Sequence, residues 1–157
     1  MRTIFSLTLT CLAMIFTGEI RADEPPIKWR RNLYEAFLEA NDSKKPLIVY
    51  FTQDNCKFCS QLERGVFNEP ELKGFANEAV FVWANSKDED DKGNYGQLRR
   101  DLRIDKFPSV VVLQTSPQGI REMGRIVGYF SLEDFVSHMR EILGPPPAST
   151  AAVMPTL

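Results

Sequence analysis

The sequence predicts an α/β domain in which helices flank a β-sheet. Short apolar runs bounded by turn residues occur at 47–51, 79–84 and 109–113, and such runs are typical of strands that are buried on both faces. Stretches with a helical apolar period separate these runs along the chain. Because strands that alternate with helices form layered structures, we expect one α/β domain.

The elements are expected in a fixed chain order. They are a helix over 29–40, a strand over 47–51, a helix from the cysteine pair through Phe67, a short helix over 70–77, a strand over 79–84, a helix over 94–103, a strand over 109–113, a strand around 120–127 and a final helix after Ser131. Trp29, Leu33 and Phe37 give the first helix its apolar face. Ser131 is the expected N-cap of the last helix, with Asp134 three residues later.

Length and charge narrow the classes of partner. A chain of 157 residues suits one domain, which buries a stable core without disulfide or metal staples. The formal net charge of −2 gives no reason to expect nucleic acid or an anionic membrane surface as a partner. We expect a monomer that carries no cofactor.

Residues 1–22 have the layout of a secretory signal peptide. Arg2 precedes an uncharged, mostly apolar stretch over 4–16, and the predicted cleavage site follows Ala22. The apolar stretch is shorter than the about 20 residues that a membrane-spanning helix needs. We therefore expect an exported protein, periplasmic or secreted, with no membrane association after cleavage.

Cleavage at this site defines the rest of the chain. It leaves a domain over 23–143 and a proline-rich tail over 144–157, which cannot continue a helix and which we expect to be disordered. It also removes Cys11, so that Cys56 and Cys59 are the two remaining cysteines.

The strongest chemical signal is Cys56-Lys57-Phe58-Cys59, which follows a predicted buried strand and opens a predicted helix. At the first turn of a helix, free N–H groups and the positive end of the helix dipole stabilise a thiolate on Cys56. Cys59 lies on the same helix face, within reach of the first sulfur. One sulfur can attack a partner disulfide and the other can release the mixed disulfide, which predicts a redox pair.

Other interpretations of the pair stay open. A zinc site usually needs four ligands, but the chain has no second C-x-x-C, and we place its one histidine, His138, at the surface or boundary of the last helix. We therefore expect no metal site. A purely structural disulfide and a carrier site for a soft ion such as Cu(I) remain alternatives.

Several further motifs accompany the cysteine pair in a recognisable order. They are Trp29 with Ala36 and Phe37, 45–51, 56–59, Leu62 and Glu63, Val66 and Phe67, Pro70 and Glu71, 95–102, Ile104, 107–110 and 119–128. On these residues the chain resembles the thioredoxin superfamily, and more narrowly the exported thioredoxin-like proteins with a C-x-x-C motif. The resemblance covers 27–143, which is nearly the whole predicted domain.

The resemblance implies a thioredoxin-like fold with a central mixed β-sheet flanked by helices. It also implies a thiol–disulfide oxidoreductase that acts on protein thiols and disulfides and has a redox partner that the sequence does not identify. Cys56 would attack and Cys59 would resolve. Pro108 would be a cis-proline facing the pair, and the Phe107 backbone would be presented to a substrate strand beside Cys56.

The chain also departs from the thioredoxin pattern. Thioredoxins have Trp before the first cysteine and an Asp six residues before it, where this chain has Asn55 and Tyr50. Tyr is a poor base near neutral pH, so Glu63 or Asp54 are the candidates to accept the proton of the resolving thiol, although Glu63 is equally a helix-surface charge.

The residues between the two cysteines also have expected roles. Lys57 favours the Cys56 thiolate by its charge, and Phe58 offers apolar contact to partner peptides. The departures at Asn55 and Tyr50 leave one further alternative, a redox-inert binding or chaperone module in which the cysteine pair is a structural disulfide.

Overall fold

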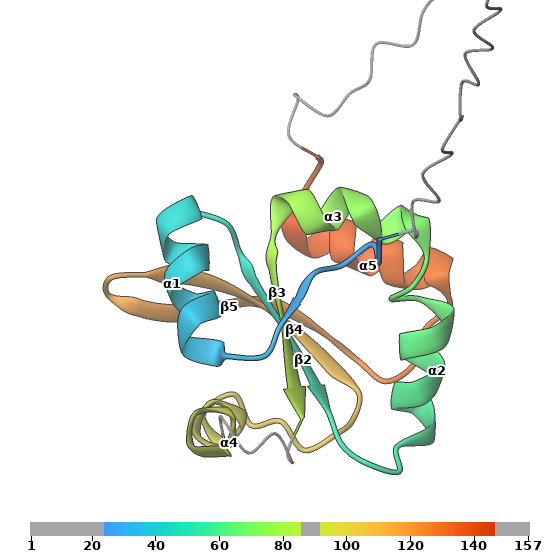
Figure 1. Ribbon diagram of the computed structural model, residues 1–157, viewed down its shortest axis with the longest axis horizontal. Coiled ribbons are helices and arrows are strands. Elements are labelled where there is room, and N and C mark those ends of the chain that lie inside the picture. Colours follow the sequence, from blue (N-terminus) through green and yellow to red (C-terminus); the bar gives the residue numbers. More distant parts are fainter. Residues whose placement is uncertain (1–23, 86–91, 147–157) are drawn as a thin grey trace, which may run out of the picture.

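A five-stranded sheet with helices on both faces forms the domain (Figure 1). The computed structural model describes residues 24–85 and 92–146, so the predicted signal segment and the tail beyond 146 lie outside the described residues. The elements are β1 (Trp29–Arg30), α1 (Leu33–Ser43), β2 (Leu47–Thr52), α2 (Lys57–Gly65), the 3-10 helix η1 (Pro70–Leu72), α3 (Lys73–Glu78), β3 (Val80–Asn85), α4 (Lys92–Asp101), β4 (Ser109–Ser116), β5 (Gly119–Val127) and α5 (Leu132–Leu143).

The sheet is mixed, as expected. Its strand order is β1-β3-β2-β4-β5; β3 is parallel to both β1 and β2, whereas β4 is antiparallel to β2 and to β5. Phe51 near the end of β2 pairs with Ser109 at the start of β4, and Ser109 pairs with Val127 at the end of β5. The loops after β2 and β5 and the loop before β4 therefore meet at one edge of the sheet.

Side chains of β2 alternate between two cores because successive residues of a strand point to opposite faces. Ile48 and Tyr50 belong to the core that contains residues of α2, α3 and α5. Leu47, Val49 and Phe51 belong to the core that contains residues of α1 and α4. All six residues of β2 are buried, which confirms the central strand predicted from the apolar run. Figure 1 shows the two helix groups on the two sides of the strands.

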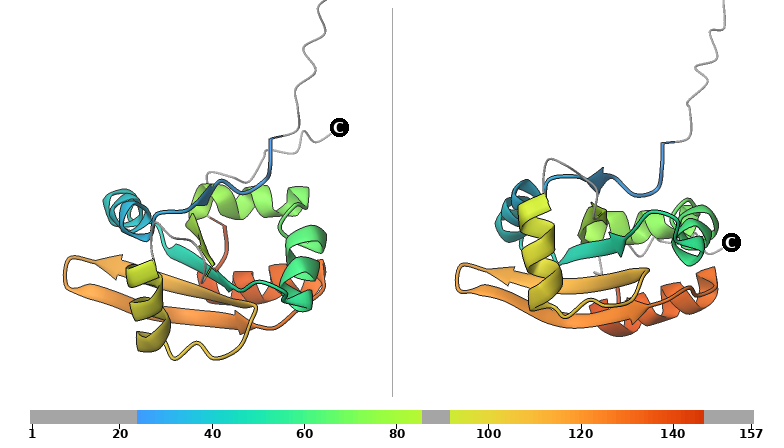
Figure 2. Two further views of the ribbon diagram at one scale, coloured as in Figure 1. Left: turned by 60° about the horizontal axis from the view of Figure 1, so that its bottom comes forward. Right: turned by 90° about the horizontal axis from the view of Figure 1, so that it is seen from below.

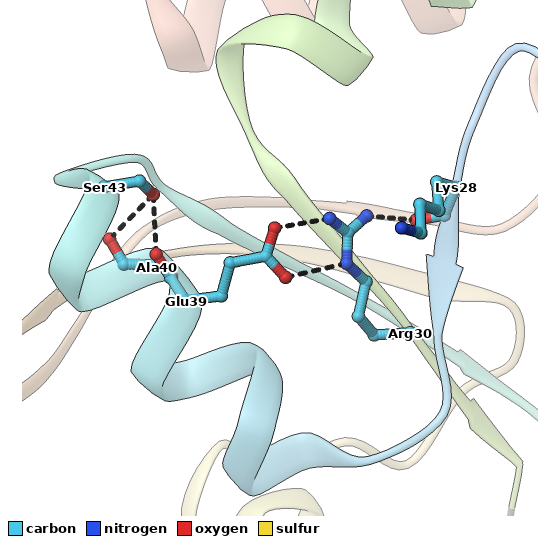
Figure 3. A network of polar contacts seen from close by, with 5 residues as sticks. All are labelled: Lys28, Arg30, Glu39, Ala40 and Ser43. Atoms are coloured by element: carbon cyan, nitrogen blue, oxygen red, sulfur yellow. Dashed lines mark hydrogen bonds and ion pairs between the residues drawn. The ribbon is translucent and has the colours of Figure 1, made fainter.

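The predicted helix over 29–40 is wrong at its start. Trp29 and Arg30 form a short strand beside β3, and α1 begins only after Asn32, whose side chain accepts the N–H of Glu35. The Arg30 guanidinium forms two hydrogen bonds with the Glu39 carboxylate and one with the Lys28 carbonyl, which ties β1 to α1 (Figure 3). The apolar spacing that suggested one helix is thus divided between a strand and a helix.

Other boundaries differ from the prediction by a turn or less. The helix α1 continues to Ser43 and ends at Lys44, which adopts a left-handed conformation with φ of 56°. The helix after the cysteines ends at Gly65, before Val66 and Phe67, which are buried in the core. The Ser131 hydroxyl accepts the N–H of Asp134, which confirms the predicted cap of α5.

Within 24–85 and 92–146, no helix combines the length and the apolar character that crossing a membrane requires.

Candidate functional site

The cysteine pair lies where β2 passes into α2. The turn between them uses Asn55 in the left-handed conformation (φ 58°), which Asn tolerates better than most residues. Cys56 is the N-cap of α2 and keeps an extended backbone, while Lys57 is the first helical residue. The structure joins Cys56 and Cys59 in a disulfide with their Cα atoms 5.2 Å apart. In Figure 1 this turn leads from the end of β2 to the lower end of α2.

The two sulfur atoms have different surroundings. Cys59 is 2% exposed and belongs to the core, whereas Cys56 is only partly buried. The N–H of Cys59 donates to Cys56 Sγ at 3.1 Å, as expected of a side chain that caps a helix N-terminus. Lys57 and Phe58 are exposed, with Phe58 at 55%. A partner molecule can therefore reach Cys56 and Phe58 without disturbing the core.

A polar hollow of about 290 Å³ opens beside the pair. It is lined by Thr52, Gln53, Asp54, Asn55, Cys56, Cys59, Ser60, Glu63, Trp83 and Asn85. Two carboxylates, those of Asp54 and Glu63, reach this hollow. Asp54 Oδ1 accepts a hydrogen bond of 3.2 Å from the Asn85 amide, so it is held toward the end of β3.

The carboxylate of Glu63 accepts hydrogen bonds from two hydroxyl groups of β2. The hydroxyl of Tyr50 donates to Glu63 Oε1 at 2.8 Å, and the hydroxyl of Thr52 donates to the same oxygen at 3.5 Å. Burial raises the pKa of Tyr50 well above its usual range, and the adjacent Glu63 carboxylate raises it further, against an opposing contribution from Thr52. Tyr50 therefore stays protonated and acts as a hydrogen-bond donor to Glu63.

Aromatic side chains surround Tyr50 on the core side. Its ring lies 4.8 Å from that of Phe67, 4.9 Å from that of Trp83 and 5.8 Å from that of Trp29. Edge-on packing of this kind restricts the rings, so the hydroxyl that reaches Glu63 has a fixed position. Trp29 and Trp83 are partly buried and pack against this core, and Trp83 also lines the hollow.

Phe107 and Pro108 precede β4, and the peptide bond between them is cis, which agrees with the resemblance. The strand register places the start of β4 beside the end of β2, on the sheet edge that carries the cysteine turn. The Phe107 ring packs against both cores, so any contact with a substrate falls to its backbone. Pro108 is buried, and its carbonyl accepts the N–H of Gly128 at 2.8 Å.

The structure adds residues that the sequence did not single out. Asn85 holds Asp54, and its position at the end of β3 became visible only with the parallel pairing of β2 and β3. Val127 and Tyr129 are 39% and 44% exposed and follow β5 to the same sheet edge as Pro108. Nothing in their sequence pattern distinguishes them from residues of an ordinary strand end.

His138 is half-buried on α5, and its Nδ1 lies 2.7 Å from the Asp134 carbonyl oxygen, in keeping with a boundary position. Among the residues that the structure describes, no group of three or more His, Cys, Asp or Glu is arranged to hold a metal ion.

Comparison with known proteins gives the same fold. A family model described as a thioredoxin-like domain matches residues 33–143, more than half of the chain. The search of curated proteins found no match.

Several solved structures share the fold. A thioredoxin from Thermus thermophilus is 22% identical with a TM-score of 0.65, over 79% of this chain and 92% of that chain. A structure described as DsbH oxidoreductase is 20% identical with a TM-score of 0.62, over 74% of this chain and 84% of that one. The C-terminal domain of Neisseria meningitidis DsbD in its oxidised form is 17% identical with a TM-score of 0.59, over 73% of this chain and 98% of that domain.

Proposed function

The chain belongs to the thioredoxin-like family, and on that premise we propose that it is a thiol–disulfide oxidoreductase that exchanges disulfides with protein substrates through Cys56 and Cys59. One observation carries the proposal. The two cysteines form a disulfide at the N-terminus of α2, with the first sulfur partly accessible and the second buried behind it. This is the division that a reaction with one attacking and one resolving thiol needs.

In the reduced protein, Cys56 attacks. Its thiolate is stabilised by the N-terminus of α2, by the N–H of Cys59 and by the charge of Lys57. The thiolate forms a bond to one sulfur of a partner disulfide, and the other partner sulfur leaves as a thiolate. The product is a mixed disulfide between Cys56 and the partner.

Cys59 then resolves the mixed disulfide. Its thiol loses a proton, and the resulting thiolate attacks Cys56 Sγ, which forms the Cys56–Cys59 disulfide and releases the second partner sulfur. The two partner thiolates take up protons, so the partner disulfide is reduced by two electrons and the cysteine pair is oxidised by two. The reverse sequence oxidises a partner dithiol.

Glu63 accepts the proton of Cys59 in this scheme. Its carboxylate lines the same hollow as both cysteines and is held there by the Tyr50 hydroxyl. The Asp that thioredoxins carry in the strand is replaced by Tyr50, and Glu63 of the helix supplies the missing carboxylate. Asp54, the other carboxylate of the hollow, is the second candidate.

Substrate binding falls to the surface around Cys56. Phe58 exposes apolar area there, and Lys57 adds a charge. The backbone before β4, at Phe107 and Pro108, provides the platform for an extended substrate segment on the same sheet edge.

The site of action in this proposal is outside the cytoplasm, in the periplasm or beyond the cell. The support is the signal-peptide layout of 1–22 and a domain that uses its cysteines as a disulfide pair.

The direct test is reduction of insulin disulfides. The wild-type domain is expected to reduce insulin in the presence of dithiothreitol, and Cys56→Ser is expected to abolish this activity. Cys59→Ser is expected to accumulate a mixed disulfide that Cys56→Ser cannot form. Exchange at the wild-type rate by the Cys56→Ser variant would refute the assigned roles.

A further inference from the structure

A second hollow begins where the cysteine hollow ends. Thr52 and Asn85 line both the cysteine hollow and a hollow of about 170 Å³ that is bounded by Phe107, Arg99 and Gly96. Gly96 and Arg99 in turn line a third, open hollow of about 530 Å³. Each hollow thus shares lining residues with the next, from the cysteines by way of Phe107 to the C-terminal end of α4.

The third hollow is basic. Three exposed arginines line it, Arg99, Arg100 and Arg103, which we call the arginine cluster, together with Gly96, Ile104 and Asp105. Figure 2 shows α4 followed by the loop that leads into β4, and this is the segment that carries the cluster. Among the described residues of the lining, three are basic and one, Asp105, is acidic, so this part of the hollow has an excess of positive charge.

Two members of the arginine cluster form side-chain hydrogen bonds within the chain. Arg99 Nε donates to the Ile104 carbonyl at 3.0 Å, and Arg100 donates to the Gln97 side chain at 2.8 Å. Within the part of the chain that the structure describes, none of the three guanidinium groups forms an ion pair with a carboxylate. Guanidinium groups in this state can bind carboxylates through paired hydrogen bonds.

Within residues 24–85 and 92–146, the charged groups of neighbouring elements form no ion pair with the arginine cluster. Arg125 of β5 also reaches the end of α4, where it donates to the Leu102 carbonyl, but its charge is paired with Glu122 of its own strand. Asp101 accepts a hydrogen bond from Gln97. Lys106, which precedes Phe107, is exposed and adds a further positive charge between the arginine cluster and the sheet edge.

The helix α4 ends at Arg103 in a way that places this side chain beside the other two arginines. The N–H of Ile104 bonds to the Arg99 carbonyl and the N–H of Arg103 to the Arg100 carbonyl, which is the Schellman ending of a helix. Arg103 takes the left-handed position of this motif, with φ of 53°, where glycine is the usual residue because a side chain is strained there. Lys44 ends α1 in the same way, so the left-handed backbone alone assigns no role, but at Arg103 it places a third basic side chain in the lining of the hollow.

Helix stability alone also favours cations at a helix C-terminus, and Arg99 and Arg100 serve it. That effect does not require an arginine at the strained position, nor a hollow that continues to the loop beside the cysteines.

We infer that the arginine cluster binds an acidic segment of the protein whose disulfide is exchanged at Cys56. The inference rests on the proposed function, because it assigns the kind of substrate that this site selects. A substrate segment lying along the three hollows places its cysteine at Cys56 and its carboxylates at Arg100 and Arg103. Charge pairing at the rim speeds encounter and selects among partners.

The test uses two synthetic disulfide peptides of equal length, in which a run of either glutamates or glutamines flanks one cysteine. The reduced full-length protein is expected to react with the glutamate peptide with a second-order rate constant about tenfold higher than with the glutamine peptide at low ionic strength, and with a smaller preference at high salt. Arg100→Glu/Arg103→Glu is expected to remove the preference while leaving the rate with the glutamine peptide unchanged.

Two control variants distinguish a loss of charge at the arginine cluster from a general effect on folding or on net charge. Arg121→Glu changes an exposed charge near the β4–β5 turn, at the opposite end of the strands, and is expected to retain most of the preference. Arg103→Gly removes the charge and relieves the left-handed backbone, so it is expected to weaken the preference while its unfolding temperature is equal to or above that of the wild type. A preference that survives in the Arg100→Glu/Arg103→Glu variant, or that Arg121→Glu removes equally, would overturn the inference.

A glutamate peptide without cysteine tests binding to the arginine cluster separately from disulfide exchange. Its binding to the oxidised domain is expected to shift the backbone amide NMR signals of 96–106, and these shifts are expected to vanish in the Arg100→Glu/Arg103→Glu variant. If exchange fails with both disulfide peptides while this binding is seen, the proposed function is wrong and the acidic-segment site stands. If exchange proceeds without a preference between the peptides and the NMR shifts are absent, the proposed function stands and the acidic-segment site is wrong.

Discussion

The hydroxyl of Tyr50 donates a 2.8 Å hydrogen bond to Glu63 Oε1, and this contact joins the central strand β2 to the helix that carries Cys59. Tyr50 is fully buried, whereas Glu63 is half-buried and faces the hollow beside the cysteines. The strand thus supplies a fixed donor where thioredoxins have a carboxylate, and the helix supplies the carboxylate.

Tyr50→Phe is expected to lower the free energy of unfolding by about 1 kcal/mol near pH 8, because it removes a hydrogen bond to a charged group. The raised pKa of Tyr50 gives this difference a pH dependence. Below about pH 10 the tyrosine is neutral in both states, so its contribution is fully present; above that pH the unfolded chain ionises while the folded protein does not, and the contribution is lost.

The measurement is urea unfolding of wild type and Tyr50→Phe across this range. Their difference is expected to fall by about 1.4 kcal/mol per pH unit above pH 10. Tyr34→Phe is the control for loss of a tyrosine hydroxyl at the surface, because Tyr34 is 63% exposed. A Tyr50→Phe difference that stays constant with pH would contradict the assigned role.

Glu63→Gln is expected to slow the resolving step, because the thiol of Cys59 loses its nearby proton acceptor. Water in the open hollow also accepts protons, so we expect a slowing on the order of tenfold, below the usual range for general bases. The measurement is the lifetime of the mixed disulfide at Cys56 after rapid mixing with a disulfide peptide.

Asp54→Asn is the matched variant, since it removes the other carboxylate of the same hollow. Its mixed disulfide is expected to resolve at a rate close to that of the wild type. The reverse result, with slow resolution in Asp54→Asn alone, would assign the proton to Asp54.

The ion pair between Arg140 of α5 and Glu78 of α3 is expected to stabilise the fold. Two hydrogen bonds of 2.6 and 2.8 Å join these side chains, and the guanidinium lies 4.0 Å from the centre of the Phe75 ring. Glu78→Gln is expected to cost about 1–2 kcal/mol in chemical unfolding, because the pair is mostly withdrawn from water. Glu39→Gln, which removes the more exposed pair with Arg30, is expected to cost less than about 1 kcal/mol. Equal losses would show that burial does not set the strength of these pairs.

Two glycines are expected to respond to alanine in opposite directions. A Cβ at Gly124 of β5 would lie 2.8 Å from Cγ1 of Ile142, a stiff β-branched side chain, so Gly124→Ala is expected to destabilise the domain by about 1–3 kcal/mol. A Cβ at Gly65 meets nothing closer than the Tyr129 hydroxyl at 4.0 Å, so Gly65→Ala is expected to stabilise the end of α2 by about 0.5 kcal/mol. Thermal unfolding of both variants distinguishes the two cases by the sign of the change.

The apolar runs predicted β2, β3 and β4 because a strand that is buried on both faces is apolar at nearly every position, and this is visible in the sequence itself. The N-terminal segment was different. Trp29 has the spacing of a helix face with Leu33, but pairing with Phe81 and packing against Phe67 and Trp83 hold it in a strand, and such long-range contacts leave no local pattern.

The site was predictable to a similar degree. The C-x-x-C motif predicted the pair of cysteines that the structure joins in a disulfide, and the departure at Tyr50 made Glu63 a candidate proton acceptor, which stays a prediction. The hydrogen bond between Tyr50 and Glu63 was not predictable, because the residues are far apart in sequence and the contact depends on how α2 packs on β2. The arginine cluster lies in a predicted helix and the loop after it, and its relation to the cysteine hollow required the pairing of β2 with β4.

The reduction potential of the Cys56–Cys59 disulfide tests the central claim most directly. It is measured by equilibrating the domain with glutathione or dithiothreitol buffers and quantifying the free thiols. An exchanging pair is expected to have a potential above about −300 mV, within the range of known thiol–disulfide oxidoreductases. A potential below about −300 mV is typical of structural disulfides and would contradict the assignment of this pair to thiol–disulfide exchange.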